Sequence, residues 1–185
     1  DAHQTLRKLP LRFCRCLRRA DGVATVAARG SRHDPEGVLM HVPDDPHLLE
    51  RVRESFARQS FMALIGTRVV SASHGKVVLE LPFRADLCQQ NGFLHGGVVG
   101  AIADVAGGYA AYSVFGDGED VLTVEYKLNL IRPAAGERLR ATGEVLRAGR
   151  TLTVCDLKVH VVRAGAELLC ASGQQTLMRM EADRA

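Results

Sequence analysis

Residues 89–111 read QQNGFLHGGVVGAIADVAGGYAA, and this stretch decides the fold because a polar loop leads directly into a long helix. Beyond the paired glycines, apolar side chains recur three or four positions apart, as they do on one face of an α-helix. The side chains in this stripe are Val98, Ile102, Val105, Tyr109 and Tyr112. The spacing predicts a helix over residues 97–115 whose apolar stripe packs against a sheet.

A second face of the same helix carries almost no side chains apart from one carboxylate. Gly100, Asp104, Gly107 and Ala111 lie on this face. Glycine inside a helix costs about 1 kcal/mol relative to alanine, so several glycines in one helix indicate a packing or functional reason. We expect this face to stay exposed and to let another backbone, a second subunit or a ligand approach Asp104 closely. The alternative is a structural carboxylate that a neighbouring backbone or arginine satisfies.

The start of the predicted helix offers a site for a developing oxyanion. Gly96 and Gly97 place free backbone N–H groups at the helix N-terminus, where the helix dipole also favours negative charge. A thioester carbonyl resting there would have Asp104 about two turns further along the helix. A carboxylate so placed can deprotonate water or attack the carbonyl carbon directly.

Strand-like segments surround the helix on both sides. Residues 121–131 alternate, with Leu128 and other apolar residues on one face and Thr123 on the opposite polar face. Asp45 and Pro46 open an earlier helix. The expected strands cover residues 69–73, 76–83, 121–131, 138–146, 151–162 and 166–178. One long helix and a predominantly antiparallel sheet give an α+β protein.

The segment 89–111 resembles the signature of the hotdog-fold acyl-CoA thioesterases of the phenylacetate-degradation (PaaI-like) type. That family shows a polar amide residue, a glycine, an apolar residue, His-Gly-Gly or His-Ala-Gly, and an aspartate nine residues after the histidine. Here His95 and Asp104 have that separation. Residues 122–134, LTVEYKLNLIRPA, also resemble the family's strand that ends in an Arg-Pro turn. The likeness runs from about residue 49 to residue 178.

The resemblance implies a fold, an activity and an assembly. The fold is one long central helix wrapped by a curved antiparallel β-sheet, and the reaction is hydrolysis of acyl-CoA to the free acid and CoA. Asp104 is the general base or nucleophile, and the Gly96 amide polarises the thioester carbonyl. Gln89 helps to position the carbonyl or the water, and Thr123 helps to orient the water. A homodimer or homotetramer with active sites shared between subunits is implied as well.

Other polar residues are weaker candidates for catalysis or for CoA binding. His95 is expected to orient the loop through its ring nitrogens rather than to act as the base. Arg132, Arg147 and Arg150 lie at strand ends or turns, where they either contact CoA phosphates or remain solvated. Cys88 is not expected to be a nucleophile, because no histidine and acid at clear spacing support it.

Composition excludes several classes of protein. The 185 residues suffice for one domain with a core, and the formal charge of +3 is too small to indicate a nucleic-acid partner. No apolar run is long enough to cross a bilayer, so no membrane contact is expected. The five cysteines show no disulfide or zinc spacing. We therefore expect reduced thiols, a cytoplasmic location, and neither a metal nor another cofactor.

Residues 1–39 differ from the rest, because arginines outnumber acids and no apolar periodicity persists. A transit peptide or an interaction arm would fit this composition. We prefer a disordered or non-native leader, followed by a hotdog domain over residues 40–185.

Two other functions stay open. A hotdog dehydratase or hydratase acting on acyl thioesters would use His95 together with Asp104. A non-catalytic acyl-CoA-binding hotdog protein would be expected to lack the carboxylate that Asp104 supplies. The sequence does not identify the acyl group, and it does not decide between a dimer and a tetramer.

Overall fold

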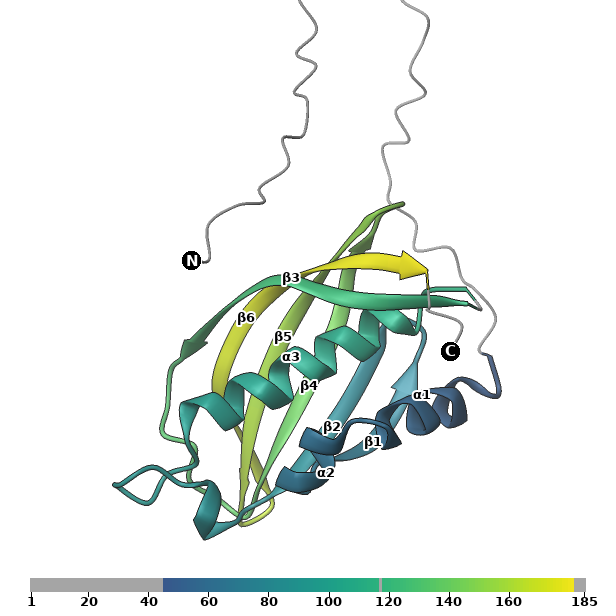
Figure 1. The fold of residues 1–185 in the computed structure, drawn as a ribbon. Coiled ribbons are helices and arrows are strands. Elements are labelled where there is room, and N and C mark those ends of the chain that lie inside the picture. Colours follow the sequence, from purple (N-terminus) through teal and green to yellow (C-terminus); the bar gives the residue numbers. More distant parts are fainter. Residues whose placement is uncertain (1–44, 117, 182–185) are drawn as a thin grey trace, which may run out of the picture. The chain divides into compact units, whose positions relative to one another are not determined.

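One long helix lies in the concave face of a curved, open, antiparallel sheet in the computed structural model, which describes residues 45–116 and 118–181 (Figure 1). The helices are α1 (Leu48–Ala57), α2 (Ser60–Ile65) and α3 (Gly96–Tyr112), with a 3-10 turn η1 at Ala85–Leu87. The strands are β1 (Arg68–Ser73), β2 (Lys76–Pro82), β3 (Glu119–Leu130), β4 (Arg138–Ala148), β5 (Leu152–Arg163) and β6 (Ala166–Glu181). Their order in the sheet is β1-β2-β4-β5-β6-β3. The predicted α+β hotdog fold is confirmed, while the leader proposed for residues 1–39 lies outside the described residues.

The core forms where α3 packs against the sheet. Ile102, Ala103 and Ala106 on the helix are fully or almost fully buried, as are Leu79, Leu139 and Leu157 on the strands beneath them. Alanines at the contact let the helix approach the sheet closely, so that the curved strands wrap around it. Across residues 45–116 and 118–181, no helix is both long and apolar enough to cross a membrane.

The small-residue face of α3 is not exposed, which corrects the expectation drawn from the sequence. Gly100, Gly107 and Ala111 are all buried within the chain. A Cβ atom on Gly107 would overlap the side-chain amide of Gln175 and lie 2.7 Å from Leu157 Cδ2. The sheet curls far enough for β5 and β6 to cover this face. The glycines are therefore needed for packing inside one subunit.

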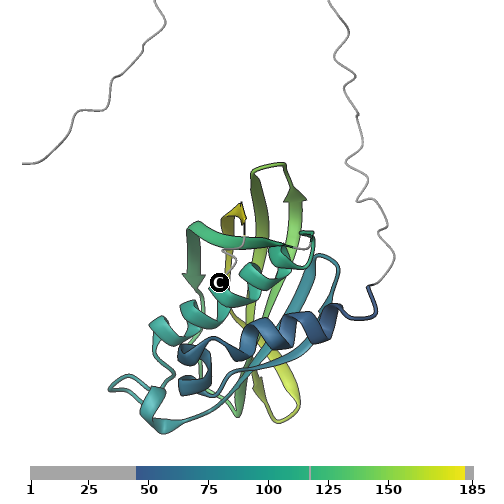
Figure 2. The same ribbon diagram turned by 45° about the vertical axis from the view of Figure 1, so that its right-hand side comes forward.

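The predicted apolar stripe of α3 is only partly buried. Ile102 and Tyr109 lie in the core, whereas Val98, Val105 and Tyr112 are half-exposed. Helix α1 lies beside α3 (Figure 2), and the Phe56 and Tyr109 ring centroids are 5.8 Å apart. Part of the stripe thus packs on α1 instead of the sheet.

A β-bulge in β3 changes which side chains face α3. The pairing of β3 with β6 shifts register between Thr123 and Glu125. Thr123, before the bulge, reaches Asp104 on the helix. After the bulge Tyr126 and Leu130 approach the helix, at 3.2 Å and 2.9 Å from Cβ positions built on Gly100 and Gly96. The strict alternation predicted for residues 121–131 is therefore wrong, because the extra residue reverses the facing of the strand.

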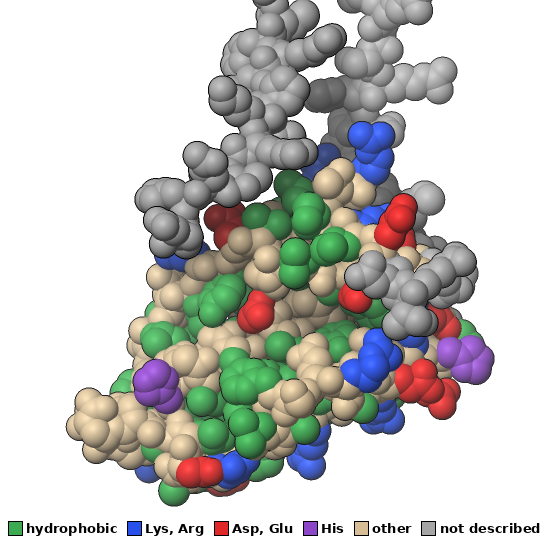
Figure 3. All heavy atoms as spheres, in the orientation of Figure 1, with side chains coloured by type: hydrophobic (Ala, Val, Ile, Leu, Met, Phe, Trp, Pro, Cys, Tyr) green, Lys and Arg blue, Asp and Glu red, His purple; other side chains and the backbone are tan. Residues whose placement is uncertain are grey.

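Strand β3 is also an edge of the sheet with an apolar outer surface. Its apolar side chains gather along the strand in Figure 3. More than half of the residue surface is exposed at Leu122, Val124 and the adjoining Ile131. An edge strand with unpaired backbone groups and exposed apolar side chains is the kind of surface that a second subunit covers.

Candidate active site

Asp104 lies half-buried in the middle of α3 and is held by two side chains. Its Oδ1 atom accepts hydrogen bonds from Thr123 Oγ1 at 2.8 Å and from Gln175 Nε2 at 2.6 Å. Burial raises the pKa of Asp104 above its ordinary value, and the Thr123 hydrogen bond partly opposes this. Within the described part of the chain, no group donates to Oδ2. That oxygen is left to take a proton or to attack a carbonyl carbon.

Gln175 belongs to this cluster and was not predicted from the sequence. Its side chain is 1% exposed, and Nε2 also lies 2.9 Å from Thr123 Oγ1 and 3.1 Å from the Asp104 carbonyl oxygen. A signal was present, because Gln175 alternates with the buried Ala171 and Leu177 on the inward face of β6. A glutamine at a core position needs a polar partner. Asp104 is that partner, but only the folded sheet shows it.

At the start of α3, the His95 side chain accepts one backbone N–H and leaves another free. His95 Nδ1 accepts the Gly97 N–H at 2.9 Å, so the exposed histidine caps the helix. Among the described residues none accepts the Gly96 N–H, which therefore remains a free donor at the positive end of the helix dipole. A neutral His95 then carries its proton on Nε2. The supporting role expected for His95 stays a prediction.

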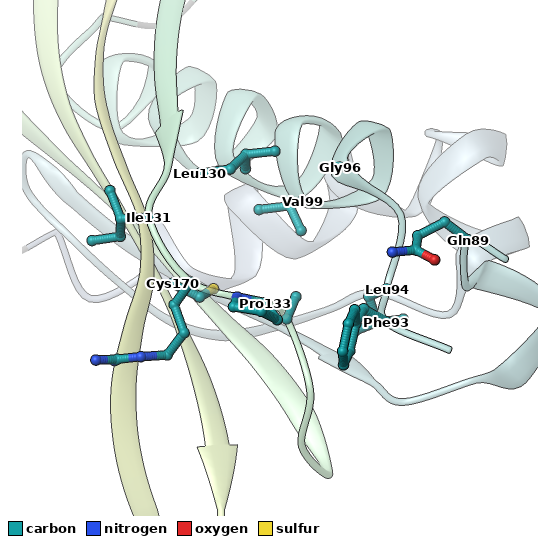
Figure 4. A pocket seen from close by; sticks show the side chains of 11 residues that line it. Gln89, Phe93, Leu94, Gly96, Val99, Leu130, Ile131, Pro133 and Cys170 are labelled. Atoms are coloured by element: carbon teal, nitrogen blue, oxygen red, sulfur yellow. The ribbon is translucent and has the colours of Figure 1, made fainter. Parts of the chain in front are cut away.

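A pocket of about 380 Å³ opens at this end of α3. Figure 4 shows Gln89 and Phe93 on one side of it and Leu130 and Ile131 on the other. Gly96 lies between them, so the structure brings together two residues predicted for the carbonyl site. The Gln89 side-chain oxygen accepts the Asn91 N–H, which fixes the amide in the loop.

A second pocket, of about 290 Å³, lies between α1, α3 and β3. Thr123 lines it, and Thr123 in turn contacts Asp104. Because Gly96 precedes Asp104 by eight residues of α3, the two lie about 12 Å apart along the helix axis. One chain therefore places the free Gly96 N–H in the first pocket and the Asp104 carboxylate beside the second.

The three arginines considered as contacts for CoA phosphates do not form one cluster in a single chain. Arg132 lines the first pocket, where its Nη1 donates to the Leu169 carbonyl oxygen at 3.0 Å. Arg147 lies near the end of β4 and Arg150 in the turn before β5. That turn lies near the beginning of β3, whereas Arg132 follows its end. Within residues 45–116 and 118–181, no group of three His, Cys, Asp or Glu side chains has the arrangement of a metal site.

Comparison with known proteins shows the family to which this chain belongs. Residues 91–165 match the model of the thioesterase superfamily. A crystal structure of a thioesterase family protein from Silicibacter pomeroyi is 44% identical, with a TM-score of 0.70, and the match covers 72% of this chain and 98% of that one. The chain belongs to the thioesterase superfamily.

Two further proteins show which other thioesterases and folds this chain resembles. The 1,4-dihydroxy-2-naphthoyl-CoA hydrolase of Listeria monocytogenes is 30% identical over 108 residues, which cover 58% of this chain and 86% of the relative. The PaaI protein from the phenylacetic acid degradation operon of E. coli shares the fold, with a TM-score of 0.64, 22% identity, and coverage of 72% of this chain and 93% of that one. The predicted hotdog thioesterase and its enzymatic class are confirmed. The matched residues include Gly96, Asp104 and Thr123, whereas Gln89 and Gln175 lie outside them.

Proposed function

We propose that this thioesterase hydrolyses acyl-CoA to the free acid and CoA, with Asp104 as general base or nucleophile. The observation that carries the proposal is the Asp104 cluster, in which Thr123 and Gln175 fix one carboxylate oxygen and leave the other free. Partial burial raises the pKa of the carboxyl and makes the carboxylate more basic than it is in water. A base of this kind can take a proton from water as the water attacks the thioester.

The Gly96 N–H is the proposed donor to the thioester oxygen, with Gln89 beside it in the same pocket. Since Gly96 and Asp104 lie about 12 Å apart along one helix, they do not reach the same carbonyl group in one chain. We therefore propose a site shared by two subunits, in which Gly96 faces the partner subunit's Asp104. The exposed apolar side chains of the edge strand β3 support association into a homodimer or homotetramer.

CoA thioesters are the proposed substrates, and a relative named as a CoA-thioester hydrolase supports this. Arg132, on the rim of the Gly96 pocket, is placed to meet a phosphate or the pantetheine arm. Arg147 and Arg150 reach the same ligand only from a partner subunit. The free cysteines Cys88, Cys155 and Cys170 support a reducing compartment, for which the cytoplasm is the proposal.

A panel of aliphatic and aromatic acyl-CoA thioesters, assayed for thiol release by the purified protein, tests this function. We expect hydrolysis by the wild type and a loss of at least about a hundredfold in the Asp104→Asn variant. Enoyl formation without thiol release would identify a dehydratase, and binding without either reaction would identify a carrier. Near-wild-type hydrolysis by folded Asp104→Asn protein would exclude the proposed mechanism.

A further inference from the structure

Tyr126 brings a phenol hydroxyl to the face of α3 that carries Asp104. In the pairing of β3 with β6 it lies opposite Gln175, whose amide holds Asp104. The Tyr126 hydroxyl oxygen lies 3.2 Å from a Cβ position built on Gly100, so the end of the ring occupies the room that this glycine leaves. The bulge after Thr123 makes this possible, because the extra residue turns Tyr126 toward the helix.

Gly100 and Asp104 lie one helical turn apart on α3. Positions four residues apart face the same side of a helix, with their Cβ atoms about 5–6 Å from each other. A helical side chain covers the turn before its own Cα atom, so the Asp104 carboxylate leans toward Gly100. The Tyr126 hydroxyl approaches the same interval from the strand. The phenol oxygen and the carboxylate therefore border one space.

The two oxygens of Asp104 have different surroundings. Thr123 and Gln175 both donate to Oδ1, and the Thr123 hydroxyl also accepts from Gln175. These two side chains hold the carboxylate from one side. Within residues 45–116 and 118–181, no group donates to Oδ2 and none bonds to the Tyr126 hydroxyl. Two polar oxygens that face each other beyond direct contact are the usual partners of a bridging water.

We propose that Tyr126 positions the attacking water, which donates one hydrogen to Asp104 Oδ2 and the other to the Tyr126 hydroxyl oxygen. This inference rests on the proposed function, with Asp104 acting as the general base. A phenol oxygen accepts as well as donates, so it can take this bond. With both hydrogens held, the lone pairs of the water face the thioester carbonyl carbon, whose oxygen the partner subunit's Gly96 binds.

The hydrolytic step balances through Asp104. As the water oxygen bonds to the carbonyl carbon, Oδ2 takes the proton that it already holds by a hydrogen bond. The carbon–sulfur bond then breaks with its electron pair on sulfur, and Asp104 returns the proton to the CoA thiolate. Tyr126 keeps its own proton throughout. Its contact is with the attacking water and not with acyl-CoA, so its loss should lower kcat without weakening substrate binding.

Tyr126→Phe tests the inference in the full-length enzyme, because it keeps the ring and removes only the hydroxyl. With an acyl-CoA that the wild type hydrolyses, we expect kcat to fall by about tenfold while KM stays within about twofold. The acidic limb of the kcat/KM profile should not move, because the bonds from Thr123 and Gln175 remain. Lys127→Met is the control, because Lys127 is exposed on the opposite face of β3, and it should match the wild type.

Gly100→Ala tests the same hydroxyl from the helix side. Its Cβ atom would displace the Tyr126 oxygen, so kcat should fall here too, with KM and the acidic limb unchanged. In a Tyr126→Phe background that oxygen is absent, so Gly100→Ala should cause little further loss. If Tyr126→Phe does not fold, the kcat of Gly100→Ala decides the matter.

Several results would overturn the role of Tyr126 while thioester hydrolysis stands. They are wild-type kcat in folded Tyr126→Phe, a loss confined to KM, a shifted acidic limb, or losses that simply add in the double variant. Absence of thiol release by the wild type from every acyl-CoA tested would instead overturn the proposed function itself.

Discussion

Asp104 combines partial burial with hydrogen bonds to only one of its oxygens, so the folded protein holds a carboxylate that is more basic than usual. Its pKa is higher in the folded state than in the unfolded chain, so the folded state binds the proton more tightly. Folding stability from this group is therefore present at low pH and is lost as pH rises through the range between the two pKa values. At neutral pH the ionised side chain lowers the free energy of unfolding.

Because the ionised Asp104 side chain lowers the free energy of unfolding at neutral pH, Asp104→Asn should not destabilise the protein. The asparagine Oδ1 atom still accepts from Thr123 and Gln175, while the cost of the partly buried charge disappears. We expect the melting temperature at pH 7 to equal or exceed that of the wild type, although hydrolysis falls. Thermal unfolding at pH 4 and pH 7 checks this, and the advantage should shrink at pH 4. A variant that melts well below the wild type at pH 7 would contradict this account.

Gln175→Leu separates the positioning of Asp104 from its chemistry. The substitution removes a donor that stabilises the ionised carboxylate, so the pKa of Asp104 should rise further. Since the ionised form is the proposed base, the acidic limb of the kcat/KM profile should move to higher pH, and kcat should fall by about tenfold. The neighbouring Gln174 is exposed, so Gln174→Leu is the control and should leave the profile unchanged. Identical pH profiles for the two variants would show that Gln175 does not stabilise the ionised Asp104 carboxylate.

At the residue scale the sequence predicted what local spacing determines. Gly96, His95 and Asp104 lie within one loop and one helix, so their order along the chain already placed them. Gln175 comes from β6 and reaches Asp104 only through the curvature of the sheet, 71 positions away in sequence. A buried glutamine between Ala171 and Leu177 predicts a polar partner without identifying it.

Among the elements, α3 shows why the type of an element is easier to predict than the face it buries. The apolar spacing and the glycines at its start predicted a helix over residues 97–115, and the structure has it at Gly96–Tyr112. Which side faces the sheet depends on how far the strands curl around it, and no local pattern contains that information. Likewise the bulge in β3 depends on its pairing with β6, so alternation alone misplaced the residues after Thr123.

The two adjacent glycines of α3 provide a matched pair that tests this packing. Gly107→Ala places a methyl group against Gln175 and Leu157, and should destabilise the protein by about 1–3 kcal/mol as overpacked core substitutions do. Gly108→Ala finds no atom closer than 4.0 Å, and should add up to about 1 kcal/mol of helix stability. Urea unfolding at one fixed protein concentration measures both. Equal effects at the two positions would show that β5 and β6 do not cover α3 as described.

At the scale of the whole molecule, a single chain holds the residues of the proposed site in two separate pairs. Gly96 and Gln89 line one pocket, and Asp104 and Thr123 lie together beside another. The sequence predicted Gly96 and Asp104 from local spacing and Gln89 and Thr123 through the family resemblance, but it did not show how far apart one subunit holds the two pairs. This division determines which combinations of damaged subunits should regain activity.

Co-expression of Asp104→Asn and Gln89→Ala subunits tests the shared site directly. Each proposed site combines Gln89 of one chain with Asp104 of the other. In a mixed dimer one site therefore contains both substitutions and the other contains neither. With random assortment, activity should recover to about a quarter of the wild-type value per chain, far above either variant alone. A site formed within one chain would show no recovery, because every chain carries a lesion.

In the control mixture, both substitutions affect residues that the same chain contributes to a site. Asp104 and Thr123 contact each other within one chain, so an Asp104→Asn subunit and a Thr123→Val subunit damage both sites of a mixed dimer. This pair should stay as inactive as its parents, and sedimentation should show that both mixtures still associate. Recovery in the first mixture and not in the second requires Gln89 to act across the interface with the partner subunit's Asp104. Recovery in both, or in neither, would mean that the two pockets do not combine in this way.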